Sequence, residues 1–182
     1  MSFLGNVVTS FQKWASDQIN SILLRLTSVE QRQTTEVKTL TGLSSVTFTL
    51  PAGCARATFY HTNVVANAVA SKLYRVGTGA GTLESGYTGC VVTVSSGPSV
   101  SAVTNATGLD VAASQIADVA TGVCVVQCDG AFASLALTQS ISNANWVQQG
   151  TSKVAASAIT TVRFLVTSGT FTSGIVRAIY EV

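Results

Sequence analysis

Charged residues are scarce in this chain of 182 residues. They make up 10% of the sequence, as ten Lys and Arg against eight Asp and Glu, whereas roughly a quarter of an average soluble domain is charged. The net charge of +2 falls far short of the basic surface that binds a nucleic-acid backbone, so we expect no nucleic-acid partner. Hydrophobic residues make up 47%, which excludes an intrinsically disordered chain, because disorder requires low hydrophobicity and high net charge.

Long apolar runs are also missing. The most apolar stretches, such as 109–126, are interrupted by polar residues before they reach the roughly 18 residues that cross a bilayer. The N-terminus shows no basic segment followed by an apolar core and a small-residue cleavage site, which is the pattern of a secretory signal. We therefore expect that the protein is made in the cytoplasm and does not insert into a membrane.

Residues that could carry catalysis or hold a metal are few. His61 is the only histidine, no Gly-x-Ser-x-Gly sequence occurs, and nothing in the sequence marks a pair among the acidic residues after position 42 as a glycosidase pair. The four cysteines are Cys54, Cys90, Cys124 and Cys128. We interpret them as small buried side chains, with one or two disulfides left open. The sequence predicts no enzyme, no metal site and no cofactor.

A glycine-rich segment, Gly77-Thr78-Gly79-Ala80-Gly81, follows a candidate strand. A dinucleotide-binding fingerprint would need a further glycine at position 82 and a helix whose N-terminal amides hold the phosphates. Position 82 is Thr82, and another turn follows. We therefore interpret the segment as a glycine-rich loop of a β domain.

The first 42 residues differ from the rest, because they hold seven of the eighteen charges and the only helix-like pattern. Apolar residues recur there with the 4-3-4-3 spacing of a coiled-coil seam, at Ala15, Ile19, Ile22, Leu26 and Val29. This spacing predicts a helix that self-associates as a short coiled coil. A seam this short is marginal alone. The alternative is an amphipathic helix folded against its own domain.

Short strand-like segments begin after residue 42. Val46, Phe48 and Leu50 alternate with threonines up to a Pro-Ala-Gly turn at 51–53. Further strands are expected at 55–62, 71–77, 89–95, 122–129, 131–139, 159–167 and 174–182. The stretch 95–121 has no clean period, and we interpret it as a mixture of strand and long loop. The pattern predicts a mainly β protein, with an antiparallel β-sandwich or jelly-roll-like domain over 43–182 preceded by an N-terminal helical segment over 1–42.

Several short motifs follow one another in order across 46–182. They are a strand and Pro-Ala-Gly turn with a basic residue at 48–56, a glycine-rich loop and Ser-Gly-Tyr at 76–87, Trp146-Val147, an Ile-x3-Arg strand at 159–163 and a Thr-Phe-x-x-Gly segment at 170–181. This order resembles the C-terminal β-domain of tailed-bacteriophage fibre and spike proteins. The resemblance implies a homotrimeric virion protein, and it brings no catalytic residues.

Together the two parts predict a short trimeric fibre or spike on a virion. The helix would bundle with its copies and bind other virion proteins, and subunit contacts would bury an apolar surface with few charges. In one interpretation the β-domain adsorbs to host-surface glycan through loops at 77–88 and 140–152. The candidate ligand residues there are Thr78, Glu84, Tyr87 and Trp146. In the other, the protein decorates the capsid or joins tail parts and binds only virion proteins.

Overall fold

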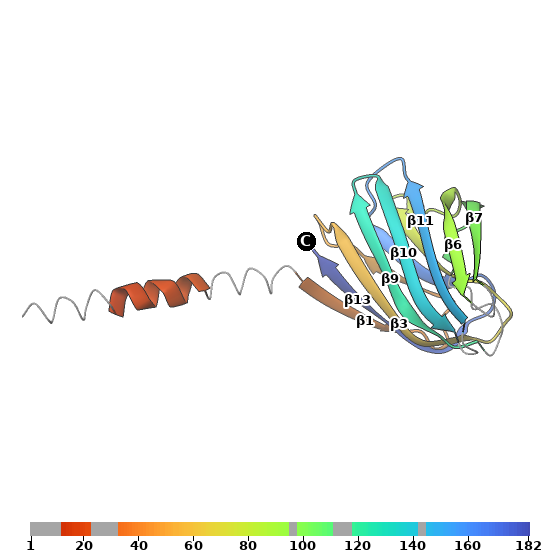
Figure 1. Cartoon of the computed structure of the whole chain (residues 1–182), viewed down its shortest axis with the longest axis horizontal. Coiled ribbons are helices and arrows are strands. Elements are labelled where there is room, and N and C mark those ends of the chain that lie inside the picture. Colours follow the sequence, from red (N-terminus) through yellow and green to blue (C-terminus); the bar gives the residue numbers. More distant parts are fainter. Residues whose placement is uncertain (1–11, 23–32, 95–97, 111–117, 142–144) are drawn as a thin grey trace, which may run out of the picture. The chain divides into compact units, whose positions relative to one another are not determined.

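The computed structural model describes residues 12–22, 33–94, 98–110, 118–141 and 145–182 (Figure 1). The chain divides into two compact units, Met1–Thr34 and Thr35–Val182. In the first unit, residues 12–22 form a helix. No helix among the described residues is long and apolar enough to cross a membrane.

The larger of two sheets contains eight strands in the order β1-β13-β3-β9-β10-β11-β6-β7 (Figure 1). Its strands are β1 (Gln33–Thr39), β3 (Arg56–Ala66), β6 (Tyr87–Val94), β7 (Pro98–Ala106), β9 (Ala120–Asp129), β10 (Phe132–Ile141), β11 (Asn145–Val154) and β13 (Phe171–Glu181). The pairings from β13 to β7 are antiparallel. We call this sheet A.

The smaller sheet, sheet B, has the order β2-β12-β4-β5, with β8 also paired to β4. Its strands are β2 (Ser45–Thr49), β4 (Lys72–Thr78), β5 (Gly81–Thr82), β8 (Leu109–Asp110) and β12 (Thr161–Val166). All of its pairings are antiparallel.

Aromatic rings from both sheets meet in one core. Phe48 of β2 contacts Phe59 of β3 edge-on, with ring centroids 5.2 Å apart. Phe164 of β12 stacks on Phe171 of β13 at 5.3 Å, and both belong to a single buried hydrophobic cluster. The two sheets therefore pack face to face, which confirms the mainly β, sandwich-like architecture expected from alternating apolar residues.

The expected strands occur close to their predicted positions, but two segments differ. Residues 33–39, expected to belong to the helical segment, form β1, so the compact β unit begins at Thr35 rather than near residue 43. The expected loop at 140–152 is largely strand, because β11 begins at Asn145. The segment 95–121, expected to mix strand and loop, contains the strands β7 and β8, and its residues 95–97 and 111–117 lie outside the described part.

β1 lies at the edge of sheet A, which explains why the sequence pattern did not predict it as a strand. Its side chains alternate between exposed Thr35, Val37 and Thr39 and the half-buried Glu36 and Lys38, so it has no buried apolar face to detect. The strand is held from its C-terminal side instead. The amide of the next residue, the buried Leu40, donates to the carbonyl of Gly174 at 3.0 Å.

His61 is a buried polar residue in the core. The Tyr74 hydroxyl lies 3.2 Å from its Nδ1, and Gln139 Oε1 lies 3.2 Å from its Nε2. Because the amide oxygen can only accept, Nε2–H donates to it and Nδ1 accepts from Tyr74. The histidine is thus held neutral, and burial lowers its pKa to about 4. This satisfied histidine is structural.

The lowered pKa of His61 predicts a specific pH dependence of folding. In the unfolded chain His61 is protonated near pH 6.5, whereas in the folded chain it stays neutral down to about pH 4. The contribution of neutral His61 to the free energy of unfolding is therefore complete above pH 6.5 and is lost as the pH falls toward 4. The cost should reach about 3 kcal/mol. Urea unfolding at several pH values checks this, with His61→Gln as the comparison. A stability profile between pH 7 and 4 that is the same in both proteins would contradict it.

Candidate functional site

The glycine-rich segment forms the β4–β5 hairpin, as a loop of a β domain should. Glycine is required at position 77 because Thr161 and the backbone of Gly81 lie very close to it, not because a ligand binds there. A Cβ atom there would lie 2.5 Å from Thr161 Oγ1 and 2.9 Å from the carbonyl oxygen of Gly81. No side chain fits at this position, because the hairpin packs directly against β12.

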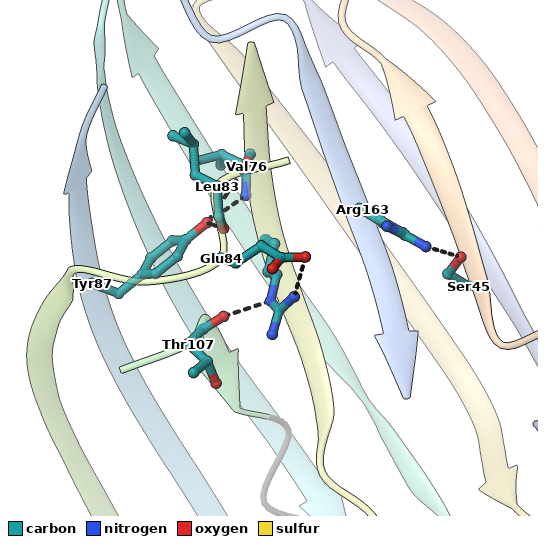
Figure 2. Close-up of polar contacts among 8 residues, drawn as sticks. Ser45, Val76, Leu83, Glu84, Tyr87, Thr107 and Arg163 are labelled. Carbon is teal, nitrogen blue, oxygen red and sulfur yellow. Dashed lines mark hydrogen bonds and ion pairs between the residues drawn. The ribbon is translucent and has the colours of Figure 1, made fainter. Parts of the chain in front are cut away.

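Tyr87, a predicted ligand residue, anchors this loop from inside. Its side chain is fully buried, and its hydroxyl accepts from the Val76 amide at 2.9 Å and donates to the Leu83 carbonyl at 3.0 Å (Figure 2). Burial raises its pKa to about 12. Tyr87 is therefore placed inside the fold rather than at a ligand surface: its ring is part of the core, and its hydroxyl ties the loop to β4.

Thr78 is also turned into the fold. It is 7% exposed, and its hydroxyl accepts from the Ala80 amide at 3.2 Å, which closes the turn. Glu84, in contrast, reaches solvent and lies 3.5 Å from the Arg75 guanidinium, with a side chain 74% exposed. An ion pair this exposed contributes little stability. Of the predicted loop residues 78, 84 and 87, Glu84 is the one whose side chain a ligand can reach.

Trp146 does not join the other predicted ligand residues. It pairs with Val94 at one end of β6, whereas Tyr87 begins that strand at the other end. Seven residues of extended chain separate the two positions by about 23 Å. The side chain of Trp146 lies outside the described part. The four residues therefore do not form one site.

The predicted helix seam is described in part. Ile19 and Ile22 are 57% and 55% exposed, and Ala15 is half-buried. Trp14 adds a further ring that is 58% exposed. The seam positions Leu26 and Val29 lie outside the described residues. Two large aliphatic side chains and an indole are thus presented on one short helix.

A cavity of about 400 Å³, which the sequence did not predict, lies at one end of the sandwich. It is lined by the turn at 50–55, residues 128–130 and residues 158–160. The turn has the form of a β-turn, since the Cys54 amide donates to the Pro51 carbonyl at 3.0 Å and Gly53 has φ 78°. Two half-buried thiols, Cys54 and Cys128, both line the cavity. Only the register between β3 and β9 brings them together, so no local sequence signal could have shown it.

Burial keeps these thiols protonated. It raises the pKa of Cys54, and it raises the pKa of Cys128 to about 11, with a smaller contribution from Cys54. Cys124, fully buried, also has a raised pKa. All four cysteines are free, and no group of three or more metal-ligating side chains occurs among the described residues.

No family model and no curated protein matches this chain. Solved structures that partly resemble it include the legume lectin-like domain from Entamoeba histolytica, with a TM-score of 0.30, 12% identity and coverage of 85% of this chain and 92% of that one. The Drosophila NLP core has a TM-score of 0.22 and 12% identity, covering 82% and 97%. The infectious bursal disease virus VP2 subviral particle has a TM-score of 0.13 and 9% identity, and the match covers 83% of this chain and 42% of that one. Likenesses this weak assign neither family nor function.

Removing the Tyr87 hydroxyl should test its role as an anchor. Tyr87→Phe leaves the ring in place but deprives the Val76 amide and the Leu83 carbonyl of their partner, which should cost about 1–3 kcal/mol of folding free energy. Chemical denaturation measures the cost. Tyr60→Phe is the matched control, because Tyr60 is 41% exposed; equal effects of the two substitutions would contradict the assignment.

Thiol alkylation should follow burial. We expect iodoacetamide at pH 7.5 to modify the exposed Cys90 first, Cys54 and Cys128 slowly and Cys124 only on unfolding. The rate at Cys128 should rise about tenfold per pH unit up to about pH 11, because the thiolate is the reacting form. Peptide mass mapping reads out each site, and rapid labelling of Cys128 at neutral pH would refute the raised pKa.

Proposed function

We propose that this protein is a bacteriophage virion structural protein that forms a short homotrimeric fibre or spike. The N-terminal helix holds the copies together as a short coiled coil and binds other virion proteins. The β unit, a jelly-roll-like sandwich, contacts the host surface by adsorption to glycan and carries out no chemistry. The order of motifs over 46–182, which resembles tailed-phage fibre domains, supports the class of protein.

The observation that carries self-association is the apolar surface of the helix. Trp14, Ile19 and Ile22 are each more than half exposed in the single chain. Large apolar side chains left in water are a cost that association removes. Ile19 and Ile22 are three residues apart on the seam, as knobs of a coiled coil are.

The outer face of sheet A supports association of the β units as well. A groove of about 610 Å³ there is lined by Tyr60, Ile175, Val37, Ile179, Thr62 and Arg177. Val37, Ile175 and Tyr60 are 55%, 47% and 41% exposed. Exposed apolar patches of this kind are typical of surfaces that bind other proteins.

The alternative is a capsid decoration, head-fibre or tail-connector protein whose β unit binds only other virion proteins. The burial of Thr78 and Tyr87 favours it, because two of the four candidate glycan contacts are turned into the core. Electron microscopy of virions carrying a labelled copy separates the two functions. A label at the tail tip or baseplate supports adsorption, and a label on capsomer axes supports decoration.

Charging the seam tests the trimer directly. Ile22→Asp together with Leu26→Asp should convert the trimer to monomer, because burying two carboxylates per chain in a helix seam costs several kcal/mol. Light scattering after size exclusion gives the mass. Asn20→Asp with Ser21→Asp adds the same charge outside the seam positions and should leave the mass unchanged. An intact trimer in the seam variant would show that the seam is not the organiser.

A further inference from the structure

Two arginines lie side by side on the outer face of sheet B. Arg163 of β12 and Arg75 of β4 are direct cross-strand partners, and Thr47 of β2 is the partner of Arg163 on its other side. Neighbouring residues on these strands, such as Val162 and Phe164, belong to the buried core, so both arginines belong to the opposite face. Like charges directly opposite each other destabilise a sheet.

The two guanidinium groups are compensated unequally. Arg75 has the Glu84 carboxylate within 3.5 Å and donates from Nε to the Thr107 carbonyl (Figure 2). The nearby Lys38 is likewise paired, with Glu36 at 2.9 Å. Arg163 has no carboxylate within 4.0 Å among the described residues; its Nη2 donates to the Ser45 hydroxyl at 2.8 Å. The neutral hydroxyl of Ser45 is therefore the side-chain partner that the positive charge of Arg163 has among the described residues.

A donor of Arg163 also lacks an acceptor. Its Nε is buried and has no hydrogen-bond partner among the described residues. A buried N–H without an acceptor destabilises the fold, and a bound ion is one of the physical explanations for such a group in a native structure. A half-buried guanidinium with spare donors is suited to an oxyanion, because its planar fork binds two oxygens at once.

Hydroxyl groups surround this position. Thr47 and Thr49 of β2 are exposed, and Thr161 lies two residues before Arg163 on β12. Threonine hydroxyls donate and accept hydrogen bonds, as the hydroxyls of a sugar do. The outer face of sheet B therefore combines one uncompensated cation with several neutral hydroxyls.

We propose that Arg163, with Arg75 beside it, binds the acidic group of a carbohydrate, either a sugar carboxylate or a sugar phosphate, while Thr47, Thr49 and Thr161 contact its hydroxyls. The inference rests on the proposed adsorption to glycan and specifies the chemistry of that glycan. It places the ligand on the outer face of sheet B rather than on the loop residues that the sequence suggested. Binding should weaken with rising salt, because the attraction is electrostatic.

The test is isothermal titration calorimetry of the full-length protein with four separate ligands: glucuronate, glucose 6-phosphate, inorganic phosphate and neutral glucose. We expect saturable binding of at least one acidic sugar and none of glucose. Arg163→Gln should weaken that binding at least tenfold, and Arg163→Lys should weaken it less, since the charge stays but the fork is lost. Arg56→Gln is the matched control: it removes an exposed charge on sheet A, where Arg56 lies 3.8 Å from Glu181, and should change nothing.

Each result decides the proposal. Tighter binding of an acidic sugar than of inorganic phosphate supports a glycan ligand, and equal binding of the two assigns the site to free oxyanions and overturns the carbohydrate part. No binding of any acid, or equal loss in the Arg163 and Arg56 variants, overturns the site. A label at the tail tip combined with no acid binding would leave adsorption standing and reject this ligand, so the two proposals fail separately.

Discussion

The contact between the two sheets through aromatic rings is the interaction on which the rest of this structure depends. Tyr74 and Phe164, on neighbouring strands of sheet B, lie 4.6 Å apart between ring centroids, and Phe59 and Phe171 meet them from sheet A. Each buried ring removes a large apolar area from water. This layer lies between the two sheets, and the proposed functional features lie on their outer faces and on the helix.

The outer faces of the two sheets differ in chemistry. Sheet A presents Val37, Tyr60 and Ile175 to solvent, whereas sheet B presents arginines and threonines. An apolar face suits contact with protein, and a face with spare hydrogen-bond donors suits a polar ligand. The proposed fibre or spike uses both, with association on one side of the β unit and adsorption on the other.

Alternation along single strands made most of the fold predictable. Val46, Phe48 and Leu50 point to the core as their spacing indicated, and the glycine-rich segment is a hairpin. β1 was not predictable, because an edge strand carrying Glu36 and Lys38 shows no apolar period. The segment 33–39 was therefore included in the predicted helical part, 1–42.

The candidate site was less accessible to sequence reasoning, because it depends on register between distant strands. The sequence around Tyr87 does not show that its ring is buried, because the partners of its hydroxyl include Val76 on strand β4. Arg75 and Arg163 are 88 positions apart in the numbering, and only the pairing of β4 with β12 makes them neighbours. Cys54, in the turn before β3, and Cys128 of β9 are likewise distant in the sequence, and they line the same cavity because the end of β9 bonds to the backbone of Ala55.

The mass of the native assembly tests the central claim most directly, since the proposal attributes both the helix seam and the apolar composition of the β unit to burial between identical chains. Native mass spectrometry of the full-length protein at low micromolar concentration gives this mass without a reference structure. The account predicts one dominant species of three chains, each of 18.7 kDa. A dominant species with the mass of a single chain would contradict it.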